Sequence, residues 1–342
     1  MESPHPCRTS NHYMTMTAQT IKMTPRRLAP LRQLVVGVDG GGTQTRAAVL
    51  DNGRVLGEGS AGPSNPLRVG IGNGATAIRE AVDKACAAAR IHRDDIVAAG
   101  VGLAGVRRTD IRARMHDVLV ESLGIQNIEL VTDGDIALYG ATDGHAGIVI
   151  ISGTGSISVG VNRQGKRASA GGWGPVAGDE GSASWIARRA LQSVARACDG
   201  RGPKTSLTEA ACEFFQVATP DDLSTAIYAP SMTNDRIAAF SKNVIEAARA
   251  GDDVAREILH EAGTELARAA MTVIRKLKME QERFQIAFVG GVFAAGELIV
   301  RPLREQVLRV ARKAFIANPA FLPTIAAGRM AQEHLHRLPV AV

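Results

Sequence analysis

Several patterns that mark particular protein classes are missing from this 342-residue chain. No apolar run is long enough to cross a bilayer, so we do not expect a membrane partner or a membrane-spanning protein. Aromatic residues make up only 4% of the sequence and do not alternate with a basic stripe, so a nucleic-acid partner is not expected either. The four cysteines show neither Cys-x-x-Cys nor Cys/His ligand spacing, and we expect reduced structural thiols in a cytoplasmic protein. They are Cys7, Cys86, Cys198 and Cys212.

The positive charge is concentrated at the N-terminus. The formal net charge is +6, yet residues 1–33 hold five basic residues against one acid, which leaves +2 for the rest of the chain. This segment also lacks hydrophobic periodicity and the apolar region of a secretory signal. We therefore predict that residues 1–32 form a disordered basic tail.

A glycine turn between two strands opens the remaining chain. Gln33–Val38 and Thr45–Leu50 both show the β-branched pattern of strands, and Gly40-Gly41-Gly42 stands between them. Helices and strands alternate afterwards, with strands expected at Ile96–Leu103 and Ile128–Val131. The later helices include one expected at about Asp179–Ala197 and one at about Asp235–Ala250. This order predicts an α/β fold with a mixed sheet and helices on its faces.

A second hairpin begins the same pattern again. A shift of 112 residues places Gly41 on Gly153, in the turn between Ile148–Ile151 and Ile157–Val161. Residue identity between the halves is low, so chance similarity is the alternative to duplication. A duplication predicts two domains, residues 33–143 and 144–338, with a cleft between them. The last expected helix, at Pro323–Arg337, could pack back on the first domain.

The two glycine hairpins are candidate phosphate-binding sites. Walker and Rossmann motifs need a helix directly after their glycines, whereas here a strand follows. Bare backbone amides in a tight hairpin can approach phosphate oxygens, and neighbouring hydroxyls can donate to them. One such turn could be only a turn, but two of them across a cleft would hold a polyphosphate from both sides. The candidates are Gly40, Gly41, Gly42, Thr43 and Thr45 in the first hairpin and Gly153, Thr154 and Gly155 in the second.

Acidic residues at two strand ends are candidates for metal binding and catalysis. Asp39 ends the first strand, where its carboxylate could hold Mg²⁺ directly or through water, or only cap the turn. Asp133 follows a buried strand and starts a helix, a position from which a carboxylate could accept the proton of an attacking hydroxyl. Helix capping is the alternative for Asp133 and for Asp135.

Glycine-dense loops supply candidate ligand contacts. Gly172, Trp173 and Asp179 combine glycine backbone, an indole and an acid, as sugar sites often do. Core burial of Trp173 and a helix cap at Asp179 are the alternatives. Asn65 could add a contact from the opposite domain, or belong to an ordinary turn. A further strand breaks at glycines before a helix, leaving flat backbone for an adenosine or a close-packed turn. This last segment contains Gly290, Gly291 and Ala295.

Together these motifs resemble the N-acetylglucosamine kinases and BadF/BadG-type ATPases of the actin and hexokinase superfamily. The resemblance covers about Leu34 to Leu335 and rests on four segments. It implies two duplicated actin-like (ribonuclease H-like) domains, with ATP and Mg²⁺ as cofactors and an amino sugar as substrate. The four segments are Asp39–Thr43, Ile151–Ser156, Gly171–Gly174 and Gly178–Ser182.

The resemblance also implies residue roles. Thr43 and Thr154 would contact ATP phosphates, and Asp133 would be the catalytic base. The residues implied to bind the sugar are Asn65, Asp133, Gly172, Trp173 and Asp179. Asp135 departs from the kinase pattern, so the base stays open between Asp133 and Asp135. No cysteine lies in a loop suited to an iron–sulfur cluster, and the zinc-binding cysteines of ROK proteins are missing.

The sequence thus predicts an ATP-dependent kinase that forms N-acetylglucosamine 6-phosphate from N-acetylglucosamine. Glucosamine and N-acetylmuramic acid are alternative substrates. A regulatory or sugar-sensing ATPase that does not transfer phosphate to sugar is the alternative of another class. We also expect a homodimer.

Overall fold

The computed structural model describes residues 1–2 and 33–337. The predicted basic tail, apart from Met1 and Glu2, lies outside the described residues, and so does Cys7. The chain divides into two units, residues 1–32 and 33–342, and every helix and strand given below belongs to the second. None of the described helices is long and apolar enough to cross a membrane.

The first sheet has five strands in the order β3-β2-β1-β4-β5. Three of them form an antiparallel meander, and β4 and β5 then add in parallel beside β1. The central strands β1 and β4 are almost continuously buried runs of small and β-branched residues, as expected where helices cover both faces of a sheet. The strands are β1 (Leu34–Gly40), β2 (Thr45–Asp51), β3 (Arg54–Ala61), β4 (Ile96–Leu103) and β5 (Ile128–Thr132).

The second sheet repeats this arrangement, in the order β10-β9-β6-β7-β8. Again a three-strand antiparallel meander comes first, and two strands then add in parallel on the side of its first strand. The strands are β6 (Gly147–Ser152), β7 (Ser156–Val161), β8 (Arg167–Gly171), β9 (Gln285–Val289) and β10 (Phe315–Ile316). The matching strand orders confirm the duplicated mixed-sheet fold that the paired hairpins predicted.

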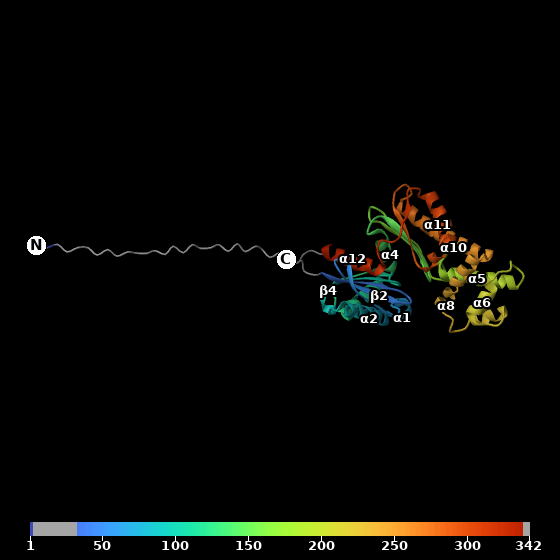
Figure 1. The fold of residues 1–342 in the computed structure, drawn as a ribbon, viewed down its shortest axis with the longest axis horizontal. Coiled ribbons are helices and arrows are strands. Elements are labelled where there is room, and N and C mark those ends of the chain that lie inside the picture. The colour runs from blue at the N-terminus through green and yellow to red at the C-terminus, as the bar shows by residue number, and fades with distance from the viewer. Residues whose placement is uncertain (3–32, 338–342) are drawn as a thin grey trace. The chain divides into compact units, whose positions relative to one another are not determined.

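Helices cover both sheets (Figure 1). On the first sheet, α2 packs against β2 and β3, and α3 lies against α2. On the second, α10 crosses β6, β7 and β8, and α11 packs on α10. The helices that precede β6 in the chain are α1 (Pro66–Val69), α2 (Ile71–Ala89), α3 (Thr109–Leu123) and α4 (Asp133–Thr142). The others are α5 (Ala183–Cys198), α6 (Leu207–Phe215), α7 (Leu223–Ile227), α8 (Asn234–Ala239), α9 (Ser241–Ala250), α10 (Asp253–Leu277), α11 (Glu297–Val310) and α12 (Pro323–Arg337). Short 3-10 turns span Arg93–Asp95, Pro220–Asp222 and Gly291–Ala295.

Two helices differ from the sequence-based expectation. A helix predicted over Asp179–Ala197 begins only at Ala183, because Ser182 is its N-cap and accepts a hydrogen bond from Trp185 N at 3.2 Å. A single helix predicted over Asp235–Ala250 is broken at Phe240, whose fully buried ring packs against other phenylalanines. Tertiary packing therefore overrides the helical periodicity at Phe240.

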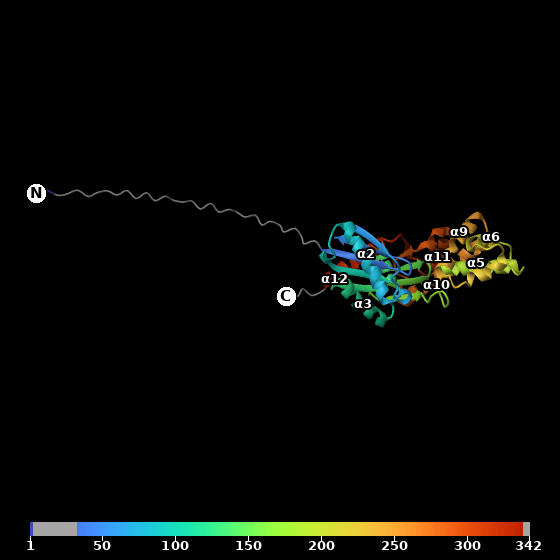
Figure 2. The same cartoon turned by 90° about the horizontal axis from the view of Figure 1, so that it is seen from below.

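The last helix, α12, returns to the first sheet and lies against β1 and β4 (Figures 1 and 2). Glycines allow this approach: a Cβ on Gly37 would lie 1.9 Å from the carbonyl oxygen of Thr324, and one on Gly100 would lie 1.9 Å from that of Ala327. Helix and strands thus meet backbone to backbone. Helix α12 is therefore part of the packing of the first sheet. The domain division between residues 143 and 144 stays a prediction.

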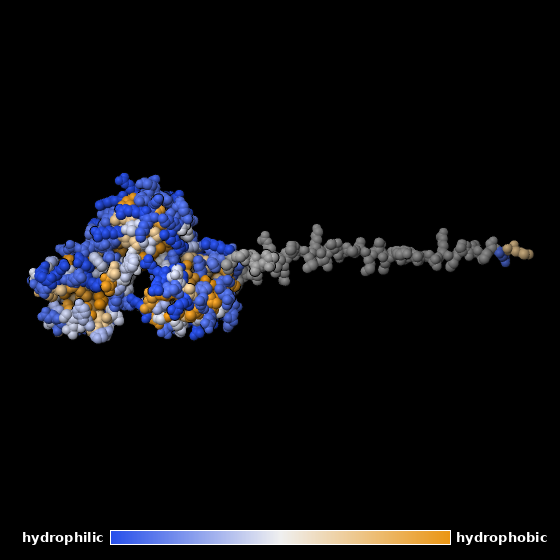
Figure 3. All heavy atoms as spheres, turned by 180° about the vertical axis from the view of Figure 1, so that it is seen from behind, coloured by the Kyte–Doolittle hydropathy of each residue, from blue (hydrophilic) through white to orange (hydrophobic). Residues whose placement is uncertain are grey.

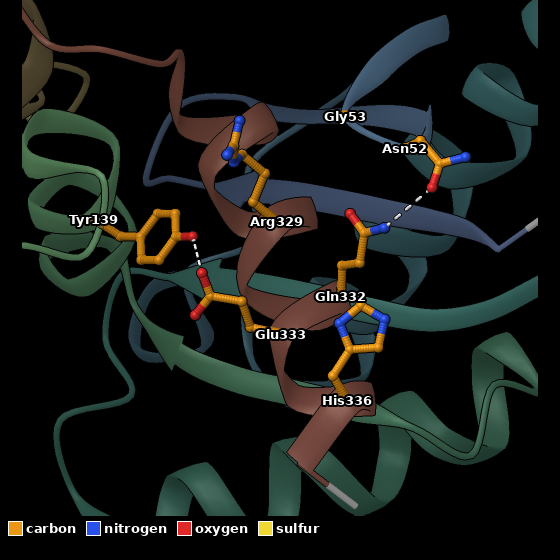
Figure 4. A pocket seen from close by; sticks show the side chains of 7 residues that line it. All are labelled: Asn52, Gly53, Tyr139, Arg329, Gln332, Glu333 and His336. Atoms are coloured by element: carbon orange, nitrogen blue, oxygen red, sulfur yellow. Dashed lines mark hydrogen bonds between the residues drawn. The ribbon is translucent and has the colours of Figure 1, made fainter.

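Side chains on α12 also line a cavity of about 260 Å³ (Figure 4). Tyr139 of α4 points its hydroxyl at Glu333 and donates to it, while Gln332 reaches Asn52 in the β2–β3 turn at 3.5 Å. Burial, followed by the bond to Glu333, raises the pKa of Tyr139 to about 12. The cavity holds none of the predicted site residues, and its contacts tie α12 to the first domain.

Replacing Gly100 by alanine should lower the free energy of unfolding by about 1–3 kcal/mol, because the new methyl group must displace the Ala327 carbonyl and with it α12. The matched control is Gly72→Ala at the exposed start of α2, where a Cβ meets open space. Alanine there should raise the same free energy by about 0.5–1 kcal/mol. Urea denaturation measures both, and equal effects would contradict the close packing of α12.

Candidate active site

The first glycine hairpin is a closed turn between β1 and β2. Gly41 N donates to the Gln44 carbonyl at 3.0 Å, which fixes the turn. Gly40 has no room for a side chain, since a Cβ would lie 2.6 Å from Ser64 Oγ. Thr43 is exposed at the tip, and its hydroxyl is open to a ligand. The turn therefore presents backbone amides and one free hydroxyl.

Thr45 has a different place from the one that the sequence suggested. Its side chain is fully buried, and Oγ1 lies 2.8 Å from both Gly62 O and Ser64 Oγ. The loop that contains Ser64 and Asn65 also donates two backbone N–H groups to the Gly41 carbonyl, at 3.1 and 3.2 Å. Thr45 thus holds this loop against the hairpin, and a direct phosphate contact is not supported by its burial.

The second hairpin is closed in the same way and is held from behind by α5. Gly153 N donates to the Gly155 carbonyl at 2.9 Å. Ser184 Oγ donates to the Thr154 carbonyl at 2.6 Å. A Cβ on Gly290 would lie 2.1 Å from Ser152 O, so the predicted adenosine segment reaches this hairpin. The structure therefore brings Gly290 and the second phosphate candidate together.

The other two residues of the adenosine prediction differ in exposure. Gly291 is exposed and begins the 3-10 turn, with open space where a Cβ would be. Ala295 is 4% exposed and packs in the core, although it contributes to the lining of a cavity of about 700 Å³ beside α11. Backbone at Gly290 and Gly291 is thus available to a flat ligand.

Asp39 and Asp133 end neighbouring parts of the first sheet. Asp39 lies opposite Gly102 of β4, which lies opposite Val131 of β5, two residues before Asp133. Burial, followed by the charge of Asp133, raises the pKa of Asp39 to about 6. Asp133 is exposed to water on one side and surrounded by protein on the others, as at the floor of a cleft. The surrounding protein raises the pKa of Asp133 too. The two carboxylates therefore repel each other where the strands end.

The structure distinguishes Asp133 from Asp135. Asp135 completes a capping box with Thr132: its Oδ2 accepts from Thr132 N at 3.2 Å and from Thr132 Oγ1 at 2.8 Å. Its other oxygen accepts from Arg167 of β8. Within residues 33–337, Asp133 instead accepts hydrogen bonds only from backbone N–H groups of its own turn, including Gly134 N at 2.9 Å, and pairs with no other side chain. Asp135 is engaged as a cap, and Asp133 is the carboxylate open to a substrate.

The glycine-rich loop between β8 and α5 exposes its tryptophan. Trp173 is 76% exposed, which excludes the alternative of core burial. Gly171, Gly172 and Gly174 have φ values of 84°, 73° and 85°, a left-handed backbone that favours glycine. Gly172 N donates to Ser156 O at 2.9 Å. The loop is thus fixed next to the second hairpin, with the indole turned outward.

Asp179 lies beneath this loop. It is 6% exposed, and a Cβ on Gly155 would lie 2.8 Å from its carboxylate. Burial raises the pKa of Asp179, and backbone N–H groups of Ser156 and Gly174 lower it in part. Since Ser182 caps α5, Asp179 is not the cap of that helix. Its carboxylate connects the second hairpin to the tryptophan loop.

Asn65 caps the short helix α1. Its Oδ1 accepts from Leu67 N at 3.0 Å and lies 2.2 Å from the place of a Cβ on Gly105. The carbonyl oxygen is therefore occupied, and its amide NH₂ group remains to donate to a ligand.

Contacts between the two halves of the chain lie close to the candidate site residues. Figure 3 shows a hollow in the described part, between the half that holds the first sheet and the half that holds the second. Arg68 of α1 forms an ion pair with Asp235 of α8 at 2.7 Å. The same guanidinium lies beside the first hairpin, with Nη1 3.1 Å from the place of a Cβ on Gly42. Sequence reasoning missed Arg68, because a contact between residues 167 positions apart leaves no local signal.

The donor set fits a Mg²⁺ ion. Asp39 and Asp133 are hard oxygen donors. Burial raises the pKa of both, and the charge of Asp133 raises that of Asp39 further, so a cation between them and a phosphate would stabilise their ionised forms. Within residues 1–2 and 33–337, no group of three or more His, Cys, Asp or Glu side chains is placed to hold a metal ion. Mg²⁺ in phosphoryl-transfer sites keeps several waters and needs only one or two carboxylates.

Comparison with known proteins identifies the family. The model of the BadF/BadG/BcrA/BcrD ATPase family matches residues 36–321, which is most of the chain. The chain belongs to this family. The predicted family resemblance is thereby confirmed, and the matched range spans both hairpins and Asp133.

Two similar relatives are named as sugar kinases. An N-acetyl-D-glucosamine kinase of Dictyostelium discoideum is 32% identical over 312 residues, which is 88% of this chain and 98% of that protein. An N-acetylmuramic acid/N-acetylglucosamine kinase of Clostridium acetobutylicum is 34% identical over 261 residues, 75% of this chain and 85% of that protein.

Solved structures of sugar kinases are also similar to this chain. One from Chromobacterium violaceum, assigned as an N-acetylglucosamine kinase, has a TM-score of 0.75 at 28% identity and covers 89% of this chain and 100% of its own. A ROK family glucokinase from Streptomyces griseus has a TM-score of 0.55 at 20% identity, covers 88% of this chain and 99% of its own, and supports the fold alone. The two-domain actin-like fold class is thus confirmed.

The two carboxylates at the start of α4 should affect stability in opposite ways. Folding raises the pKa of Asp133, so its ionisation costs folding free energy and stability falls as the pH rises through the folded pKa. Asp133→Asn should therefore raise the free energy of unfolding at about pH 8 and raise it less at about pH 4, where the wild-type carboxyl is largely protonated. Asp135→Ala removes a helix cap and should lower it by about 0.5–2 kcal/mol. Urea denaturation at both pH values measures this, and equal destabilisation at pH 8 would refute the assignment.

Proposed function

We propose that this protein is an ATP-dependent amino-sugar kinase that transfers the γ-phosphoryl group of ATP to the 6-hydroxyl of N-acetylglucosamine. The observation that carries the proposal is the open carboxylate of Asp133, at a strand end beside Asp39. Two closed glycine hairpins and an exposed tryptophan loop are the other parts that such a reaction needs.

Each residue has a chemical task in this proposal. Asp133 accepts the proton of the 6-hydroxyl as the oxygen attacks the γ-phosphorus; the new O–P bond forms, the bond to the β-phosphate oxygen breaks, and ADP leaves. Backbone amides at Gly42 and Gly155, with the hydroxyls of Thr43 and Thr154, hold the phosphates, since Gly41 N and Gly153 N already close their own hairpins. Mg²⁺, held by Asp39 directly or through water, would neutralise phosphate charge.

The sugar would lie against the tryptophan loop. Trp173 offers an exposed aromatic face, Gly172 offers backbone, and Asn65 offers an amide from the opposite half. Asp179 is buried between the second hairpin and this loop, so one edge of its carboxylate would hold the loop while the other accepts a sugar hydroxyl.

The choice of substrate follows what the relatives share. Their names specify N-acetylglucosamine, N-acetylmuramic acid and, for a Vibrio cholerae protein 28% identical over 232 residues, glucosamine. All are amino sugars, so we propose an amino sugar here, with N-acetylglucosamine first. A homodimer and a cytoplasmic location stay predictions.

Asp133→Asn should lower kcat about 10²–10⁴-fold and leave sugar binding largely intact, because the amide can still meet the hydroxyl but cannot take its proton. Coupled ADP release with N-acetylglucosamine measures turnover, and calorimetry measures sugar binding. The matched control is Asp117→Asn on α3, whose side chain is 83% exposed. Near-normal turnover in Asp133→Asn would remove Asp133 from the base role. ADP release that needs no sugar would indicate a regulatory or sugar-sensing ATPase instead.

Activity should fall on the acid side because Asp39 and Asp133 must both be ionised. The pKa of Asp39 is about 6 and that of Asp133 is also raised, so kcat/KM should decline below about pH 6. A plot of log kcat/KM against pH should approach a slope of about 2, and Asp39→Asn should reduce it to about 1. That variant should also need more Mg²⁺ for half-maximal activity. Constant kcat/KM from about pH 5 to pH 8 would contradict this assignment.

A further inference from the structure

A basic groove lies next to the proposed sugar site. It is a cavity of about 680 Å³ along strand β8, and the tryptophan loop forms one of its walls through Trp173. Four cationic side chains line it, and none of its lining residues is acidic. The four cations are Arg107, Lys166, Arg167 and Lys276. We call this cavity the basic groove.

Two of the four cations are already engaged. Arg167 donates to Asp135, and Lys276 Nζ donates to the Ser169 carbonyl at 3.0 Å. Arg107 and Lys166 are both exposed, and neither forms an ion pair with another residue of the described chain. The groove therefore holds unpaired positive charge, which attracts an anion.

Two contacts place the groove near the catalytic centre. Arg107 follows β4 in the first half, and its Nη1 lies 3.5 Å from the place of a Cβ on Gly172 of the tryptophan loop. Arg167 binds Asp135, two residues beyond Asp133. A ligand on the tryptophan loop would thus reach Arg107 and Asp133 together.

Protection of a sheet edge explains only part of this charge. β8 is the last strand in the order of its sheet, and Lys or Arg on such a strand discourages pairing with another chain. Lys276 fits this role, since it occupies a carbonyl of β8. Arg107 comes from the other half of the chain, and an outward-facing Trp173 adds nothing to edge protection. Edge protection does not explain the placement of Arg107 and Trp173, whereas a bound ligand would.

We propose that the basic groove binds a carboxylate carried by the amino-sugar substrate, with Arg107 and Lys166 as its partners. This inference rests on the proposed kinase function and adds a charge effect: the two cations favour an acidic amino sugar as a further substrate beside neutral N-acetylglucosamine, and they disfavour a cationic one. A guanidinium suits a carboxylate because it can donate two parallel hydrogen bonds. The cavity has room for a substituent beyond the sugar ring.

Three substrates that differ in charge test the preference. N-acetylmuramic acid carries a carboxylate, N-acetylglucosamine is neutral, and glucosamine carries an ammonium group. Coupled ADP release gives kcat and KM for each with the wild type, Arg107→Gln, Lys166→Gln and the double variant. Lys313→Gln, an exposed lysine outside the groove, is the matched control.

The readout is the ratio of kcat/KM for the acidic sugar to kcat/KM for the neutral one. It should fall about 10-fold or more in the double variant, mainly through KM, because a hydrogen-bonded charge partner is lost. The ratio of kcat/KM for glucosamine to kcat/KM for N-acetylglucosamine should rise in the same variant. Added salt should lower the ratio for N-acetylmuramic acid over N-acetylglucosamine in the wild type and leave it nearly constant in the double variant.

The failures are distinguishable. A wild type that phosphorylates N-acetylglucosamine but rejects the acid, or ratios that do not move in the double variant, would overturn the groove proposal and leave the kinase proposal standing. Self-association of the double variant with an unchanged ratio would assign the charge to edge protection alone. A wild type that phosphorylates none of the three sugars would overturn both proposals.

Discussion

Repulsion between Asp39 and Asp133 is the constraint that the rest of the site depends on. Burial and this repulsion raise the pKa of Asp39 to about 6, and Arg46 and Arg107 relieve the two carboxylates only in part. Such an arrangement costs folding free energy, so the packing of the sheet must hold the strand ends in place. Close contact between α12 and the central strands supplies that rigidity, through Gly37 and Gly100.

Duplication explains why the two hairpins can act on one ligand. Each sheet starts with the same meander and adds parallel strands on the same side, so each hairpin turn lies at the same place in its own half. Ion pairs between the halves, Arg68 with Asp235 and Arg167 with Asp135, then join these equivalent places. Both pairs involve residues next to the proposed phosphate or base positions, so these contacts between the halves lie at the site itself.

Local features of the site were predictable from the sequence, and its long-range contacts were not. Strand pattern and glycine position were enough for the hairpins, for the strand Ile96–Leu103 and for the last helix, because these signals are local. β3 and β8 were missed: β3 contains glycines that pack against α2, and β8 is a short edge strand of small residues. The burial of Thr45 and the exposure of Trp173 depend on which distant segments cover them.

Hydrogen bonding at the start of α4 separates the roles of Asp133 and Asp135, the two candidates for the base that the sequence left open. Thr132 and Asp135 have the spacing of a capping box, and Asp135 gives both oxygens to that cap and to Arg167. A capped helix start fixes Asp133 one residue after the strand end, where its oxygens face solvent in the cleft. Arg167, which belongs to the basic groove, thereby also stabilises the segment that presents the base. One ion pair thus joins the wall of the basic groove to the segment that positions the base, and a change at Arg167 would also alter the start of α4.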